Sequence, residues 1–338
     1  MLLRRSILVV LFVLPALANA QPLKNLQILT GISRPELERV MNQMRAGLGV
    51  HCHYCHASGE GAESDARPQK ARAREMLRMV IDLNARHFGG QPVVTCFTCH
   101  NGKPRPALAP PLPQPVPPDE PPPGEVKAPI TVPALIQKYI AAIGGREPAP
   151  AAPRLFKGTS KSPTGPQVQA TIAEVGEKLR VDIQLPDGST LTRASDAKGG
   201  WVRDQNGVRD LQPEDLARVA LARRGFAPFH TSNIGNNTRV DSDKLGDRNA
   251  WVIVTPTARY WFDAESGLLL RRVVYYDSPI GRMPEQTDFD DYRDVDGVKL
   301  PFVVRALVVD PWAGGTRQAE SIRVGVPIPP REFEKPSP

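Results

Sequence analysis

Two copies of one five-residue pattern constrain this chain more than any other feature. Residues 52–56 read Cys-His-Tyr-Cys-His and residues 96–100 read Cys-Phe-Thr-Cys-His, so each copy is C-x-x-C-H. This spacing is typical of c-type haem attachment. Two thiols so placed can each form a thioether with one vinyl group of a porphyrin, and the histidine that follows can bind the iron. The sequence therefore predicts two covalently bound haem c groups.

The predicted attachment residues account for all four cysteines of the chain. We expect covalent attachment at Cys52, Cys55, Cys96 and Cys99, with His56 and His100 as the proximal iron ligands. A four-cysteine zinc site usually separates its pairs by about 15–20 residues, whereas Cys96 follows Cys55 by 41 positions. A zinc site also needs no histidine after each pair, so the pattern favours haem over zinc.

A helix is expected before each motif. Ser33 and Glu36 have the spacing of a capping box, and apolar residues then recur at helical spacing as far as Leu48. A second helix is expected from Pro68, because proline suits a first helical turn. Its apolar side is marked by Ala73, Met76, Met79, Val80 and Leu83.

Each predicted helix carries the pattern M-x-x-M, with Met41 and Met44 in the first and Met76 and Met79 in the second. Methionine sulfur is a normal sixth ligand of cytochrome iron. Methionines also fill irregular gaps in hydrophobic cores. Residues three positions apart share a helix face, so the periodicity leaves either member of each pair as the ligand.

Residues 25–29, 48–50, 71–79 and 94–102 carry a resemblance to the cytochrome c subunit of photosynthetic reaction centres. The resemblance implies that the first methionine of each M-x-x-M is the distal ligand, hence Met41 and Met76, with Met44 and Met79 as alternatives. That family usually carries four haems, whereas this chain has motifs for two. His51, His53 and His87 are further candidate distal ligands, although surface hydrogen bonding is their simpler role.

The first 20 residues have the pattern of a secretory signal peptide. Charged residues precede an apolar run from Ile7 to Leu17, and Ala18-Asn19-Ala20 resembles a cleavage site. The apolar run is short for a bilayer span, so no transmembrane helix is expected after cleavage. Haem is attached outside the bacterial cytoplasm, and we expect the mature protein to lie in the periplasm.

Composition divides the rest of the chain into three segments. We predict a mainly α di-haem cytochrome c domain at residues 21–107, a Pro-rich linker at residues 108–130 and an antiparallel β half-barrel-like domain at residues 131–338. A proline-rich spacer is extended and offers few contacts. We therefore expect the two domains to fold separately.

The third segment is expected to be α+β. A helix at 131–144 and another near 213–223 accompany alternating runs of strand residues, which indicates a curved antiparallel sheet on helices. The turn and strand patterns at 261–263, 267–271, 291–293 and 297–301 resemble the outer-membrane lipoprotein-sorting fold. That resemblance implies a concave face for an acyl chain or lipid; a closed core is the alternative. His230 is expected at the surface.

The leading functional hypothesis is an electron carrier that passes single electrons to and from a redox protein or a membrane electron-transfer complex. We find no nucleophile–base pair, so no catalytic residues are predicted. A di-haem peroxidase-like enzyme, which needs an open sixth iron position, is one alternative. A lipid or lipoprotein carrier with a redox module is the other. The net charge of +7 comes without a Lys/Arg tract, so no nucleic-acid partner is expected.

Overall fold

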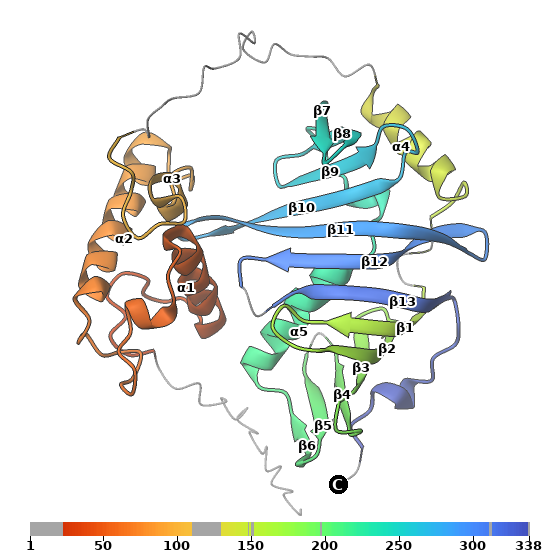
Figure 1. Ribbon diagram of the computed structural model, residues 1–338, viewed down its shortest axis with the longest axis horizontal. Coiled ribbons are helices and arrows are strands. Elements are labelled where there is room, and N and C mark those ends of the chain that lie inside the picture. Colours follow the sequence, from red (N-terminus) through yellow and green to blue (C-terminus); the bar gives the residue numbers. More distant parts are fainter. Residues whose placement is uncertain are drawn as a thin grey trace, which may run out of the picture.

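The computed structural model describes residues 23–109, 130–147, 149, 152–196, 198–310 and 313–336. The signal peptide expected at residues 1–20 and most of the linker expected at residues 108–130 lie outside them. Figure 1 shows a helical N-terminal part beside a large antiparallel sheet that carries its own helices. The predicted combination of a mainly α region with an α+β region is therefore confirmed.

Three helices build the N-terminal part: α1 (Arg34–Leu48), α2 (Pro68–His87) and α3 (Cys96–His100). The capping box at α1 forms as expected: the Ser33 hydroxyl accepts the Glu36 N–H at 3.4 Å, and the Glu36 carboxylate accepts the Ser33 N–H at 3.0 Å. The helix ends at Gly49, whose φ of 63° lies in the left-handed region that glycine tolerates. The chain then turns into a short 3₁₀ helix, Cys52–Tyr54.

The inward face of α2 differs from the predicted one. Its buried residues are Leu77, Val80 and Asn84, whereas Met79 is 46% exposed. The prediction that Met79 belongs to the apolar side is therefore wrong. Apolar residues occur on more than one side of this helix, and the packed side is selected by contacts with α1 residues such as Val40.

The sheet has 13 strands. They are β1 (Arg154–Lys161), β2 (Gln167–Val175), β3 (Lys178–Gln184), β4 (Thr190–Ser195), β5 (Gly200–Asp204), β6 (Gly207–Asp210), β7 (Arg239–Leu245), β8 (Arg248–Val254), β9 (Ala258–Asp263), β10 (Leu269–Ser278), β11 (Gly281–Val295), β12 (Val298–Val308) and β13 (Gly315–Val324). The spatial order is β6-β5-β4-β3-β2-β1-β13-β12-β11-β10-β9-β8-β7. The chain thus enters in the middle, runs to one edge, and returns from the other edge to close beside β1.

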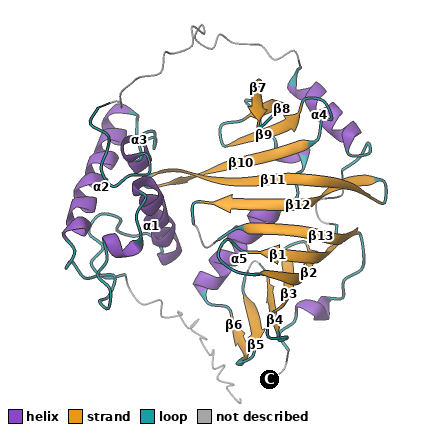
Figure 2. Cartoon of the chain, viewed as in Figure 1, coloured by secondary structure: helices purple, strands orange, loops and turns teal. Residues whose placement is uncertain are grey.

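Two helices pack on this sheet (Figure 2). Helix α5 (Pro213–Phe226) connects β6 at one edge with β7 at the other edge. Its C-terminal end is fixed by polar contacts, since Thr287 Oγ1 donates to the Gly225 carbonyl at 2.8 Å and Arg272 Nη2 donates to the Arg224 carbonyl at 3.0 Å. Both predicted helices of this region are present, and these two hydrogen bonds attach the end of α5 to the sheet.

Helix α4 (Val132–Ala142) covers the half of the sheet that contains β8–β11. Leu135 and Tyr139 are buried, and the Tyr139 ring lies 5.3 Å from Phe229 and 5.5 Å from Phe262 in edge-on contacts. Edge-on aromatic pairs add to the free energy gained by burying their area. This half of the sheet therefore has a closed core, as one of the two sequence alternatives expected.

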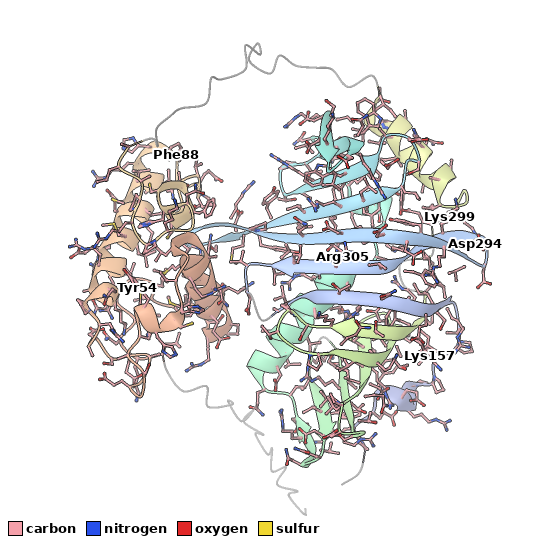
Figure 3. All side chains as sticks on the ribbon, viewed as in Figure 1. Tyr54, Phe88, Lys157, Asp294, Lys299 and Arg305 are labelled. Carbon is pink, nitrogen blue, oxygen red and sulfur yellow. The ribbon has the colours of Figure 1, made fainter. Side chains whose placement is uncertain are left out.

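His230 is 8% exposed, so the expectation of a surface residue is wrong. It directly follows the core residue Phe229, and its backbone N–H donates to Asn233 Oδ1 at 3.1 Å, which folds the segment inward. Asp294 pairs in register with Lys299, and Figure 3 shows both at the end of the sheet far from the helical part. The carboxylates of this turn therefore face solvent.

Neither a metal-binding cluster nor a membrane-spanning helix is found in the described residues. No group of three or more His, Cys, Asp or Glu side chains in this part of the chain is placed to hold a metal ion on its own. None of its helices combines the length and the apolar character that crossing a bilayer requires.

Candidate haem centre

The first C-x-x-C-H motif opens onto a cavity of about 1530 Å³. Its walls include both thiol residues, Cys52 and Cys55, and the proximal candidate His56. Met41 and Met44 of α1 line the same cavity, so the structure brings both distal candidates to the motif. The cavity thus collects one complete set of candidate attachment and ligand residues.

The orientation of His56 suits an iron ligand. Its Nδ1 lies 3.2 Å from the Ala62 carbonyl oxygen. A carbonyl oxygen can only accept, so Nδ1 carries the proton and Nε2 keeps a free lone pair. Burial, helped by the positive charge of Lys70, lowers the pKa of His56 and favours the neutral imidazole that binds metals.

The second motif forms α3 and repeats this arrangement. Thr95 caps the helix: its hydroxyl accepts the Thr98 N–H at 3.3 Å, and its own N–H donates to Thr98 Oγ1 at 3.0 Å. His100 Nδ1 lies 2.9 Å from the Lys103 carbonyl oxygen. By the same reasoning, Nε2 of His100 is free to bind a metal.

Helix α1 serves both motifs because glycine lets α3 approach it. A Cβ on Gly47 would lie 3.0 Å from Cys96 Cβ and 3.2 Å from the Phe97 nitrogen, a tight fit that would require α3 to shift by a few tenths of an ångström. The Gly102 N–H also donates to the Gly47 carbonyl at 3.0 Å. The end of α1 therefore touches the second motif, while Met41 and Met44 of the same helix line the cavity at the first.

The distal candidates for the second motif are less closely gathered. Met76 is half-buried and Met79 is 46% exposed, both on α2. Neither Met76 nor Met79 is among the described residues that line the cavity at the first motif. The roles of these two methionines stay a prediction.

Asn84 is a supporting residue that the sequence did not reveal. Although it is polar, it is 6% exposed, and its side-chain amide donates to the Val94 carbonyl at 2.7 Å and accepts the Val94 N–H at 2.9 Å. These bonds fix the chain just before Thr95 and Cys96. A polar residue on the buried stripe of a helix is the only sequence signal that could have pointed to it.

Cys55 and Cys96 lack the lowered pKa of a catalytic cysteine. None of the four cysteines is in a disulfide, and burial raises the pKa of Cys55 and Cys96. Catalytic cysteines need a lowered pKa, because the thiolate is the nucleophile. Of the remaining histidine candidates, His53 Nδ1 lies 3.3 Å from Ser58 Oγ, which fits a surface hydrogen bond.

The cavity extends beyond the first motif onto the sheet. Alternate residues of β2 and β3 line it, namely Ala170, Ile172, Leu179, Val181 and Ile183. Their register places Ala170 opposite Ile183 and Ile172 opposite Val181, so they form one apolar face. Pockets for one small ligand usually measure about 300–1,000 Å³. A cavity of about 1530 Å³ therefore has room for more than one small ligand.

One charged residue stands out in this wall. The Arg317 guanidinium lies 3.8 Å from the centre of the Phe226 ring, and both residues line the cavity. Burial lowers the pKa of Arg317 to about 10, so the group is still a cation at neutral pH. It supplies a positive charge at the edge of the apolar face.

Two C-x-x-C-H segments whose histidines both leave Nε2 free have the arrangement that c-type cytochromes use to hold haem. The family model described as photosynthetic reaction centre cytochrome C subunit matches residues 16–110. Cytochrome c-554 of Chloroflexus aurantiacus is 44% identical over 86 residues, which are 24% of this chain and 20% of that protein. The resemblance expected from the motifs is therefore confirmed for the N-terminal part.

Two photosynthetic reaction center cytochrome c subunits are also similar to this region. That of Rubrivivax gelatinosus is 30% identical over 99 residues, covering 23% of this chain and 27% of that protein. That of Thermochromatium tepidum is 32% identical over 90 residues, covering 25% of this chain and 22% of that protein. The chain thus spans between a fifth and about a quarter of the length of these relatives.

Solved structures of the lipoprotein-sorting type align with part of this chain at low sequence identity. An outer membrane lipoprotein-sorting protein domain from Vibrio parahaemolyticus aligns with 10% identity and a TM-score of 0.35, covering 59% of this chain and 94% of that one. A LolA superfamily protein from Nitrosomonas europaea aligns with 10% identity and a TM-score of 0.37, covering 61% of this chain and 98% of that one.

Proposed function

We propose that this chain is a di-haem c-type cytochrome that transfers single electrons between redox partners in the periplasm. The repeated histidine arrangement carries the proposal. His56 and His100 each place Nδ1 at a backbone carbonyl, 3.2 Å and 2.9 Å away, which leaves Nε2 for iron. The match to reaction-centre cytochromes supports haem c as the cofactor.

Each motif would hold one haem, whose iron exchanges one electron between its ferric and ferrous states. Cys52 and Cys55 would attach the first, and Cys96 and Cys99 the second. The chain supplies the proximal imidazoles and, from α1 and α2, the distal thioethers of Met41 and Met76. A histidine–methionine pair raises the reduction potential relative to two nitrogen ligands.

Exposed apolar side chains at the motifs support docking to a redox protein or a membrane electron-transfer complex. Tyr54 is 41% exposed, Phe97 and Val93 are each 56% exposed, and Phe88 is 38% exposed. Figure 3 shows Tyr54 and Phe88 on the helical part. Tyr54 belongs to the first motif and Phe97 to the second, so a partner that contacts either side chain would lie close to that motif.

Mass spectrometry tests the haem number directly. The full chain, produced in a host that matures c-type cytochromes, is expected to carry two covalent haems. Cys55→Ala should impair attachment at the first motif and Cys99→Ala at the second, because each removes one thioether. A haem-free mass with stoichiometric zinc would contradict the proposal.

A second candidate function is a carrier for an acyl chain or lipid with a redox module. The specific observation is the continuation of the cavity from the first motif onto the apolar face of β2 and β3, with Arg317 at its edge. A lipid would match both features: its apolar chain the face of β2 and β3, and its anionic head group the Arg317 cation. Ala170→Phe should fill the cavity and reduce the binding of a fluorescent fatty acid. Gln169→Phe, on the exposed face of the same strand, should leave that binding unchanged.

A further inference from the structure

The β10–β11 hairpin ends inside the helical part of the molecule. Pro279 and Ile280 form the turn between the two strands, and hairpin tips are normally exposed. Ile280 is instead 0% exposed, because it belongs to a core cluster with Leu29, Val40 and Leu77. Figure 1 shows the end of this hairpin beside α1 and α3. The tip therefore completes the hydrophobic core of the other domain.

The residues on both sides of Ile280 also touch the helical part. Ser278 Oγ lies 2.7 Å from Gln43 Oε1 of α1. Gly281 has a φ of 136°, and a Cβ there would lie 2.4 Å from Thr95 Cγ2 and 3.0 Å from Gln43 Nε2. Thr95 is the N-cap of α3 and directly precedes Cys96. Glycine leaves room for this approach, so the tip fits against α1 and against the N-cap of α3.

A third contact reinforces this placement. Arg45 Nη2 of α1 donates to the Val309 carbonyl at 3.3 Å, in the turn after β12. The proline-rich segment is thus not the only connection between the two parts. The expectation that they fold separately considered the spacer alone and did not include these contacts.

We infer that Ile280 is a positioning residue of the haem centres, through which the sheet domain sets their reduction potentials. The inference rests on the proposed function. The cluster that contains Ile280 is flanked by Met41 and Met44 before the first motif and by Cys96 of the second. An apolar side chain there holds α1 against α3 and excludes water, and the hydrophobic shell of a metal centre controls its potential.

The direction of the effect follows from charge. With neutral histidine and methionine ligands, the ferric centre carries one more positive charge than the ferrous centre. Excluding water makes that extra charge less favourable and so raises the potential. Truncating Ile280 admits water and should lower the potential.

The experiment compares variants of the full holoprotein by potentiometric titration, near-infrared absorption and carbon monoxide binding. Ile280→Ala is expected to lower the midpoint potential, weaken the histidine–methionine band and increase carbon monoxide binding. Ile280→Val should behave like the wild type, because valine still fills most of the space that isoleucine occupies. Leu307→Ala, at a 50% exposed position of β12, is the matched control and should change nothing.

Gly281→Ala tests the same contact without removing apolar volume. It should push against Thr95 and alter the signals of the second haem more than those of the first. Should Ile280→Ala fail to fold, Gly281→Ala still decides the question. Unchanged potentials and bands in Ile280→Ala and Gly281→Ala, in a wild-type protein with normal haem content, would overturn this inference alone. Absence of haem from the wild type would instead overturn the proposed function.

Discussion

His56 Nδ1 lies 3.2 Å from the carbonyl oxygen of Ala62, and Lys70 Nζ donates to the same oxygen at 2.9 Å. Lys70 Nζ also donates to the Ser64 carbonyl at 2.8 Å. One side chain on α2 thereby fixes the loop that orients the proximal histidine of the first motif. Partners of this kind control ligand orientation and basicity, and their loss typically changes metal-site properties measurably.

Lys70→Met should lower the reduction potential of the first haem. The ferric centre carries one more positive charge than the ferrous centre, and the Lys70 cation, whose charge also acts on His56, disfavours it. The expected shift is tens of millivolts, since about 59 mV corresponds to a tenfold change for one electron. Potentiometric titration measures it. Lys198→Met makes the same charge change at an exposed turn and should leave both potentials unaltered; an equal shift in both variants would show that the effect comes from net charge and not from the position of Lys70.

Asn84→Ala should destabilise the helical domain by about 2–4 kcal/mol. The variant loses two hydrogen bonds to Val94 and leaves part-buried backbone groups without these partners, at roughly 1–2 kcal/mol each. Haem absorbance can follow this domain during denaturant unfolding. All four tryptophans lie beyond residue 200, so their fluorescence reports on the sheet domain. Asn206→Ala, at an exposed turn, is the control; equal midpoints for the two variants would contradict the role of Asn84.

Asp65 should contribute to stability at neutral pH and lose that contribution in acid. Its carboxylate lies 3.0 Å from Arg74 Nη2 and 3.1 Å from Lys70 Nζ. Contacts with Arg74, Asn25 and Lys70 hold the pKa of Asp65 well below its ordinary value. Because the pKa is lower in the folded state, the stabilisation is complete above the unfolded pKa and disappears as the pH falls through the folded pKa.

The measurement is the difference in unfolding midpoint between wild type and Asp65→Asn across pH. The difference should be constant around neutrality and shrink toward zero in strong acid. Asp247→Asn, at an exposed turn between β7 and β8, should show no such pH-dependent difference. A wild-type advantage that grew in acid would reverse the assigned sign.

The features that were predictable from the sequence are the local ones. The cap at Ser33 and Glu36 involves groups three residues apart, so the sequence contains all of its determinants. The same holds for the helix that begins at Pro68 and for α4, which Thr131 caps. The haem motif is local as well, because its chemistry depends on spacing within five residues.

The errors and omissions concern contacts between distant segments. Ile280 is separated from α1 by more than 200 residues, and nothing in its own turn announces a buried tip. The periodicity of α2 predicts an apolar side that includes Met79, because periodicity cannot identify which side a partner covers. The sequence does not reveal the role of Asn84, because its partner, Val94, lies beyond the end of its helix. Such contacts depend on the tertiary fold.

The distal ligands separate an electron carrier from an enzyme. If Met41 and Met76 bind the irons, the oxidised protein should show the weak near-infrared band of histidine–methionine iron at both haems. Met41→Ala should remove the band at one haem and either lower its potential, if a nitrogen ligand replaces sulfur, or open a site for carbon monoxide. Spectra before and after exposure to carbon monoxide measure both effects.

Met44→Ala and Met79→Ala are the matched controls, and the structure distinguishes them. Met44 is half-buried against the Ile280 cluster, so its truncation should cost about 1–2 kcal/mol, less than the 2–5 kcal/mol of a fully buried methionine. Met79 is 46% exposed, so Met79→Ala should alter stability by no more than about 0.5 kcal/mol. Neither should change the band.

Carbon monoxide binding or rapid peroxide reduction by the wild-type protein would show an open iron position and favour the di-haem peroxidase-like enzyme. Loss of the band in Met44→Ala would make Met44 the ligand, one helical turn beyond the residue that the family resemblance indicates.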